Sequence, residues 1–160
     1  MRFSIVIPTF NNLEYLQLCI KSIRQNSKFE HEIIIHNNGQ NEPSEDFIKT
    51  NKIVYSKTNY NAGICEGVNL GVKKSSTKYI VYAHDDFYFL PGWDTAFTEE
   101  INKMNDNLFY LSGTMVQNGQ VNLDCGDKLE NFNEEKLLKE YKNIKILVAL
   151  IFKDQHGHHI

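Results

Sequence analysis

The sequence lacks the features that mark several large classes of protein. No G-x-G-x-x-G follows the first apolar segment and no G-x-x-x-x-G-K-[ST] occurs anywhere, so the fingerprints of dinucleotide-binding and P-loop proteins are absent. There is no run of Lys and Arg, and 17 basic against 20 acidic residues give a net charge of −3, so we expect no nucleic-acid partner. The longest apolar run, residues 146–152, is far shorter than the ~20 residues of a membrane-spanning helix, so we expect no transmembrane segment.

Cysteine is also scarce. The three cysteines, Cys19, Cys65 and Cys125, are far apart, odd in number and form no C-x-x-C pair. Because no signal peptide is evident, this pattern indicates reduced thiols in a cytoplasmic protein. Peripheral attachment to a membrane is compatible with that location. A catalytic role for one of the cysteines is the less favoured alternative.

The chain of 160 residues, 41% hydrophobic and 23% charged, has the size and composition of one globular domain. Apolar runs predict strands, and apolar residues at helical spacing predict helices. The expected strands span residues 3–7, 32–35, 52–56 and 79–83, and the expected helices span residues 13–25, 44–50 and 61–74. This alternation predicts an α/β fold with an open, mostly parallel sheet, right-handed crossovers and helices on both faces.

The pattern beyond Pro91 is more mixed. It predicts a helix over residues 92–104, a strand over 108–116, a hairpin turn at Asn118-Gly119 into a strand over 121–124, and a helix over 134–141 capped by Asn133. No repeat or linker composition interrupts the chain, so we expect a single domain over residues 1–144. Residues 145–160 form an atypical tail.

Residues 79–91 carry the strongest functional signal. An apolar, β-prone run, expected to be a buried strand, ends at Asp85 and Asp86, which follow His84 and precede three aromatic residues. Two adjacent like charges repel each other. A divalent cation relieves this repulsion, and carboxylate oxygens suit Mg²⁺ or Mn²⁺. The alternative is that the two aspartates start a turn and cap the helix after Pro91.

The carboxyl ends of parallel strands gather at one edge of a sheet. Four short polar loops are expected there, at residues 8–12, 36–40, 59–63 and 84–87. Such a crevice suits a nucleotide, with an aromatic ring and amides around the base, backbone N–H groups near phosphate, and acids with a metal ion at the diphosphate.

Four segments in this order resemble one known family. They are S-I-V-I-P-T-F-N at residues 4–11, the segment 32–40, N-A-G at 61–63 with Asn69, and Y-I-V-Y-A-H-D-D at 79–86. Over about the first 95 residues, the chain resembles the family 2 glycosyltransferases of the GT-A (Rossmann-like) fold. The resemblance implies a nucleotide-diphosphate sugar donor, with a UDP-sugar favoured over other nucleotide sugars. It also implies a glycan or lipid-linked acceptor. It further implies metal-assisted transfer with inversion, usually in polysaccharide biosynthesis.

The resemblance also implies roles for individual residues. His84-Asp85-Asp86 matches the family's D-x-D motif, which makes Asp86 the metal ligand and places Asp85 near the ribose or diphosphate. The nucleotide-sugar-binding set that follows from the match is Pro8, Thr9, Phe10, Asn37, Asn38, Gly63, His84 and Asp85. Pro8 to Phe10 border the base and ribose in this comparison, and Asn37 stands where the family has a base-reading Asp.

Two departures from the family pattern matter. Asn37 replaces an Asp, and because an amide both donates and accepts, it can still address a uracil edge with altered preference. His84 replaces the first acid of D-x-D, and it either faces the ligand, the role we favour, or caps the strand. No general base is assigned. The available acids, Asp124, Asp127, Glu130, Glu134 and Glu135, lie outside any family base motif.

The tail joins an apolar run to a segment with three histidines, which either chelate metal or belong to a disordered end. We hypothesise that the chain ends in a frameshifted, truncated version of a longer transferase, which the coding DNA would decide. The alternative function is then a nucleotide-sugar-binding remnant without transfer. A nucleotidyltransferase ranks last, because residues 3–12 contain no Gly-rich, basic loop.

Overall fold

The computed structural model describes residues 1–39, 42–116, 123–144 and 149–151. They belong to two compact units, Met1–Pro91 and Gly92–Ile160, which are described one at a time. The expectation of a single domain over residues 1–144 stays a prediction.

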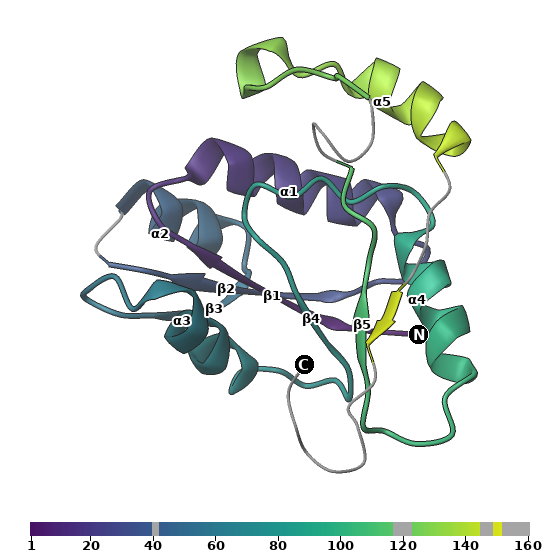
Figure 1. The fold of residues 1–160 in the computed structure, drawn as a ribbon. Coiled ribbons are helices and arrows are strands. Elements are labelled where there is room, and N and C mark those ends of the chain that lie inside the picture. Colours follow the sequence, from purple (N-terminus) through teal and green to yellow (C-terminus); the bar gives the residue numbers. More distant parts are fainter. Residues whose placement is uncertain (40–41, 117–122, 145–148, 152–160) are drawn as a thin grey trace. The chain divides into compact units, whose positions relative to one another are not determined.

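The first unit is built on a parallel sheet. Its elements are β1 (Ser4–Thr9), α1 (Leu13–Asn26), β2 (Glu32–Asn37), α2 (Glu42–Thr50), β3 (Val54–Lys57), α3 (Gly63–Val72) and β4 (Ile80–Tyr82). The strands lie in the order β3-β2-β1-β4 and every pairing is parallel. Helices α1 and α2 lie on one face of the sheet and α3 on the other (Figure 1). The predicted α/β fold class is confirmed.

The central strand β1 anchors the core of this unit. All six of its side chains are buried, as expected for a strand covered on both faces. Helix α1 buries Leu16, Ile20 and Ile23. On the other face α3 comes so close that a Cβ atom on Gly71 would lie 2.5 Å from Val6 Cγ1. The helix can approach the sheet this closely because glycine has no side chain there.

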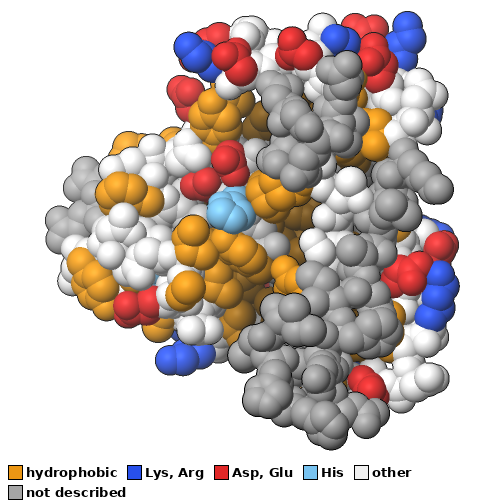
Figure 2. Space-filling model, in the orientation of Figure 1, with side chains coloured by type: hydrophobic (Ala, Val, Ile, Leu, Met, Phe, Trp, Pro, Cys, Tyr) orange, Lys and Arg blue, Asp and Glu red, His pale blue; other side chains and the backbone are white. Residues whose placement is uncertain are grey.

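Strand β4 differs from its prediction. It covers only residues 80–82, and Ile80 and Tyr82 are 38% and 39% exposed, so the expectation of a buried strand is wrong. The reason is its position at the edge of the described sheet, where one side of a strand has no neighbouring strand. The first unit accordingly presents hydrophobic side chains on its surface (Figure 2).

The second unit contains α4 (Trp93–Asn102), β5 (Tyr110–Ser112), α5 (Glu134–Glu140), β6 (Ala149–Ile151) and two short 3-10 helices, η1 (Leu129–Asn131) and η2 (Tyr141–Asn143). The predicted cap of α5 is confirmed, because Asn133 Oδ1 accepts a hydrogen bond from the Lys136 backbone N–H at 2.9 Å. Among the described residues of this unit, no helix is long and apolar enough to cross a membrane, and the same holds for the first unit.

The strand pairing that the structure describes in the second unit joins β5 to a segment of the predicted tail. Leu123 and Asp124 are in no strand, and β5 pairs in antiparallel fashion with β6, a segment of the predicted tail. The Asn118-Gly119 turn and the histidine-rich end of the tail lie outside the described residues. The hairpin itself stays a prediction.

Candidate functional site

The residues predicted to bind a ligand all belong to the first unit and lie at the carboxyl ends of its strands. Pro8, Thr9 and Phe10 end or follow β1, Asn37 and Asn38 end or follow β2, Gly63 opens α3 after β3, and His84, Asp85 and Asp86 follow β4. The register of the central pair aligns Thr9 with Asn37. The parallel topology thus gathers the predicted residues at one edge of the sheet.

The Asp85 carboxylate is fixed by two side chains, one at the end of β1 and one just before α1. Thr9 Oγ1 donates to Asp85 Oδ2 at 2.7 Å, and Asn12 Nδ2 donates to Asp85 Oδ1 at 3.0 Å. Asn12 occupies the N-cap position of α1, but its side chain makes no capping hydrogen bond. Asp85 and Asp86 do lie in a turn, as the alternative reading expected, but neither caps the next helix, because the N-cap of α4 is Gly92.

Asp86 has a different environment from Asp85. It is exposed, and within the described part of the chain its carboxylate has no hydrogen-bond or ion-pair partner. No group of three or more His, Cys, Asp or Glu side chains among these residues is placed to hold a metal ion. Mg²⁺ is commonly held by one or two carboxylates together with substrate phosphates. One outward carboxylate at the end of β4 therefore fits a cation that is shared with a diphosphate.

His84 is held by aromatic neighbours. Its Nε2 and the Tyr82 hydroxyl are hydrogen-bonded at 2.7 Å. Its ring centroid lies 5.1 Å from that of Tyr82 and 5.0 Å from that of Phe87. One ring nitrogen is thus engaged within the protein, and among the described residues the other, Nδ1, has no hydrogen-bond partner.

The two asparagines after β2 are buried, while Phe10 is exposed. Asn37 is 0% and Asn38 is 4% exposed. Asn38 Oδ1 accepts a hydrogen bond from the Ala62 backbone N–H at 3.1 Å, and the Asn38 N–H donates to the Thr9 carbonyl at 2.9 Å. Asn38 therefore connects the loop after β1 to the loop that precedes α3. Phe10, 48% exposed, presents its ring at this edge.

Sequence reasoning missed a set of polar residues on the buried side of α1. Cys19 Sγ donates to the His84 carbonyl at 3.6 Å, Ser22 Oγ accepts from the Phe89 N–H at 2.9 Å, and Asn26 Nδ2 donates to the Phe89 carbonyl at 2.7 Å. The signal that could have revealed them is their spacing of three and four residues among the apolar residues of an amphipathic helix.

Cys19 is not a reactive thiol. Burial, followed by the negative charges of Asp85 and Asp86, raises the pKa of the Cys19 thiol to about 12. Because the thiolate is the nucleophilic form, this cysteine stays protonated and unreactive near neutral pH. All three cysteines are free thiols, as the sequence predicted.

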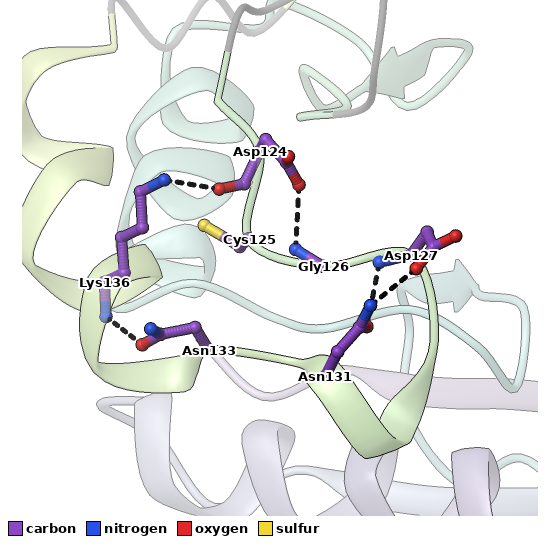
Figure 3. A pocket seen from close by; sticks show the side chains of 7 residues that line it. All are labelled: Asp124, Cys125, Gly126, Asp127, Asn131, Asn133 and Lys136. Atoms are coloured by element: carbon purple, nitrogen blue, oxygen red, sulfur yellow. Dashed lines mark hydrogen bonds between the residues drawn. The ribbon is translucent and has the colours of Figure 1, made fainter.

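The second unit has a polar hollow of about 500 Å³ formed by residues 124–136 (Figure 3). Its acids are engaged within their own loop. Asp124 Oδ1 accepts from the Gly126 N–H at 3.0 Å, Asp127 Oδ1 accepts from Asn131 Nδ2 at 2.7 Å, and Lys136 Nζ donates to the Asp124 carbonyl at 2.6 Å. These contacts explain the acids as parts of a folded loop, so neither is assigned as a base.

The first unit thus has paired acids and polar loops at the carboxyl edge of a parallel sheet, where open α/β folds bind their ligands. A sequence model of Glycosyl transferase family 2 matches residues 4–149. The chain belongs to this family, and the resemblance described above is confirmed.

Curated relatives agree with the family. An uncharacterized glycosyltransferase of Rickettsia prowazekii is 27% identical over 142 residues, which cover 84% of this chain and 43% of the relative. The GalNAc(5)-diNAcBac-PP-undecaprenol beta-1,3-glucosyltransferase of Campylobacter jejuni is 25% identical over 142 residues, which cover 83% of this chain and 45% of the relative. The chain thus spans less than half the length of these relatives.

Solved structures share the fold. TarS 1-349 of S. aureus in complex with UDP-GlcNAc has a TM-score of 0.57 and 16% identity, and the match covers 64% of this chain and 32% of that chain. The mannosyltransferase PcManGT of Pyrobaculum calidifontis, in complex with GDP-Man and Mn²⁺, has a TM-score of 0.53 and 9% identity, and the match covers 68% of this chain and 34% of that chain. The fold is therefore that of GT-A glycosyltransferases.

Proposed function

We propose that this chain binds a nucleotide-diphosphate sugar, with a UDP-sugar as the favoured donor. It takes part in transferring the sugar to an acceptor hydroxyl with inversion at the anomeric carbon. The observation that carries the proposal is the contrast between the two aspartates. Asp85 is held by Thr9 and Asn12, whereas Asp86 is exposed at the carboxyl edge of the sheet. Paired acids with one fixed and one outward carboxylate suit a site for a diphosphate and a divalent cation.

In this proposal the residues have distinct tasks. Asp86 holds Mg²⁺ or Mn²⁺, and Asp85 and His84 face the ribose or diphosphate. When bound, the cation supplies positive charge that offsets the charge on the leaving nucleoside diphosphate. In the transfer, the acceptor oxygen forms a bond to the anomeric carbon while the bond from that carbon to the diphosphate oxygen breaks. The acceptor proton passes to a general base that is not assigned.

The other site residues are proposed to bind the nucleoside. Phe10 is exposed in the loop after β1 and can contact the base, with Pro8 and Thr9 just before it at the end of the strand. Asn37 is proposed to address the edge of the base, and Asn38 follows it directly at the end of β2, where both side chains are buried. Gly63, at φ +70°, opens α3. The UDP-GlcNAc bound to S. aureus TarS 1-349 supports a UDP-type donor.

The proposal extends to the acceptor and the location of the protein. The name of the C. jejuni relative supports a glycan or lipid-linked acceptor of the kind used in polysaccharide assembly. Three free thiols support the cytoplasm, and a lipid-linked acceptor would bring the protein to the membrane surface.

Titration calorimetry of the 160-residue chain with UDP, GDP and TDP, with and without Mn²⁺, tests the proposal. We expect Mn²⁺-dependent binding of UDP that Asp86→Asn abolishes, because the amide has the shape of the carboxylate without its charge. Asp46→Asn, a change at another exposed aspartate of this unit, is the control and should bind as the wild type does. Binding that is equal in wild type and Asp86→Asn would contradict the metal assignment.

Donor binding without transfer is the second candidate function. It is favoured by the engagement of Asp124 and Asp127 within their own loop, which leaves both without a catalytic assignment. A donor-hydrolysis and sugar-transfer assay separates the two candidates, since only the first predicts release of UDP from a UDP-sugar.

A further inference from the structure

We infer that Asn12 is a positioning residue for the paired acids, and that it acts by fixing the Asp85 carboxylate so that Asp86 faces outward. The inference rests on the proposed function, which assigns the metal to Asp86, and adds a residue that lies outside the matched D-x-D motif. Asn12 reaches Asp85 across 73 positions of sequence, at 3.0 Å.

The first argument is that the Asn12 side chain is diverted from its ordinary use. Asparagine is among the preferred residues at a helix N-cap, where its side-chain oxygen accepts a hydrogen bond from a backbone N–H of the first turn. Asn12 is at this position of α1 but has φ −131° and ψ 46°, and its side chain makes no capping bond. It donates to Asp85 instead. The helix therefore lacks its side-chain cap, while a carboxylate of the site is held.

The second argument is the conformation of the residue before it. Asn11 has φ +53°, in the left-handed region that residues other than glycine rarely adopt. Asparagine tolerates this region better than most residues do. The chain thus turns sharply between Phe10 and the start of α1. A sparsely populated conformation next to a missing cap points to a local requirement other than helix stability.

The third argument is that the contact belongs to a continuous set along α1. Asn12 holds Asp85, Cys19 contacts the His84 carbonyl, and Ser22 and Asn26 bind the backbone of Phe89. These four residues attach the segment from His84 to Phe89 to a single helix. Asp86 is the exposed acid within that segment. A rigid support on both sides of Asp86 fixes where its carboxylate points.

A purely structural role makes a different prediction from a positioning role. If Asn12 only stabilised the fold, its loss would lower the melting temperature and leave ligand binding by the folded protein unchanged. If Asn12 positions the acids, its loss weakens the Mn²⁺-dependent part of binding even where the fold is kept.

Asn12→Ser separates these two roles. Serine is as good an N-cap as asparagine, but its shorter side chain cannot reach Asp85 in the same way. We expect the melting temperature to be unchanged or higher. We also expect UDP affinity measured with Mn²⁺ to fall by about tenfold, the effect of losing one hydrogen bond to a charged group. UDP affinity without Mn²⁺ should change much less.

Asn12→Ala is the second variant, because it removes the donor to Asp85 without adding a charge and should reduce Mn²⁺-dependent binding as strongly as Asn12→Ser. Gln17→Ser, which changes an exposed amide on the same helix, is the matched control and should behave as the wild type. Equal Mn²⁺-dependent affinity in wild type and Asn12→Ser would overturn the inference and leave the proposed function standing. Absence of UDP binding by the wild type would overturn the proposed function, and the inference with it.

Discussion

His36 is a histidine enclosed in the core directly below the candidate site. It is 0% exposed, its Nδ1 and Ser56 Oγ are 2.9 Å apart, and a Cβ atom on Gly67 would lie 2.8 Å from its Cδ2. Burial lowers the pKa of His36 from its ordinary value of 6.5, against smaller opposing effects of the Asn38 side chain and the Glu66 charge. The folded protein therefore favours the neutral ring.

This burial predicts a pH-dependent stability. Because the pKa of His36 is lower in the folded than in the unfolded chain, its contribution is fully present above the unfolded value of 6.5 and is lost as the pH falls below it. Urea unfolding of wild type and His36→Gln between about pH 7 and about pH 5 measures this effect. We expect the wild type to lose more stability on acidification than the variant, since glutamine does not titrate. Equal pH dependence in the two proteins would contradict the prediction.

At the scale of the element, α3 depends on glycine for its distance from the sheet. Gly71 faces Val6, where a Cβ atom would lie 2.5 Å from Val6 Cγ1. We expect Gly71→Ala to destabilise the protein by about 1–3 kcal/mol through overpacking, even though alanine is favoured over glycine within helices by about 1 kcal/mol. Urea unfolding measures the change.

A second substitution tests the cause. Val6→Ala removes the methyl groups that the new Cβ would meet, so Gly71→Ala should be much less destabilising in that background. If the two changes simply add, the loss of stability has another origin than the contact with Val6.

The central elements were predictable from sequence because their signals are local. Residues 3–7 and 32–35 are continuous apolar runs, and they became β1 and β2 with shifts of one or two residues. The exposure of β4 was not predictable in this way, since it depends on what lies beside the strand. The pairing of β5 with β6 was likewise not predictable, because β6 comes from the tail and no local signal joins the two segments.

In the candidate site, too, some features were predictable from the sequence and others were not. The positions of Thr9, Asp85 and Asp86 at one edge followed from the topology. The use of Asn12 did not, because a sequence shows an N-cap residue and gives no sign of an acceptor 73 positions away. Cys19 and Ser22 were hidden for the related reason that polar residues in an apolar stripe identify no particular partner.

At the scale of the whole molecule, the hydrophobic core is unevenly distributed. Of the buried hydrophobic residues that the structure describes, only Ile101 and Leu137 lie beyond Pro91. The four-stranded sheet, its covering helices and all the predicted site residues belong to Met1–Pro91. A unit with its own core is expected to fold by itself.

We therefore predict that a fragment of residues 1–91 folds cooperatively and retains Mn²⁺-dependent binding of UDP. A sigmoidal urea transition and a dispersed amide NMR spectrum would report the fold, and calorimetry would report binding. A fragment that ends at residue 78, before β4, is the control, since it keeps β1 to β3 but lacks both aspartates and should not bind. A fragment 1–91 that stays unfolded while the full chain folds would mean that Gly92–Ile160 supplies part of the stability of the donor-binding unit. In this fragment β4 is an edge strand with exposed Ile80 and Tyr82, so two copies could associate edge to edge. The unfolding measurement therefore uses dilute protein.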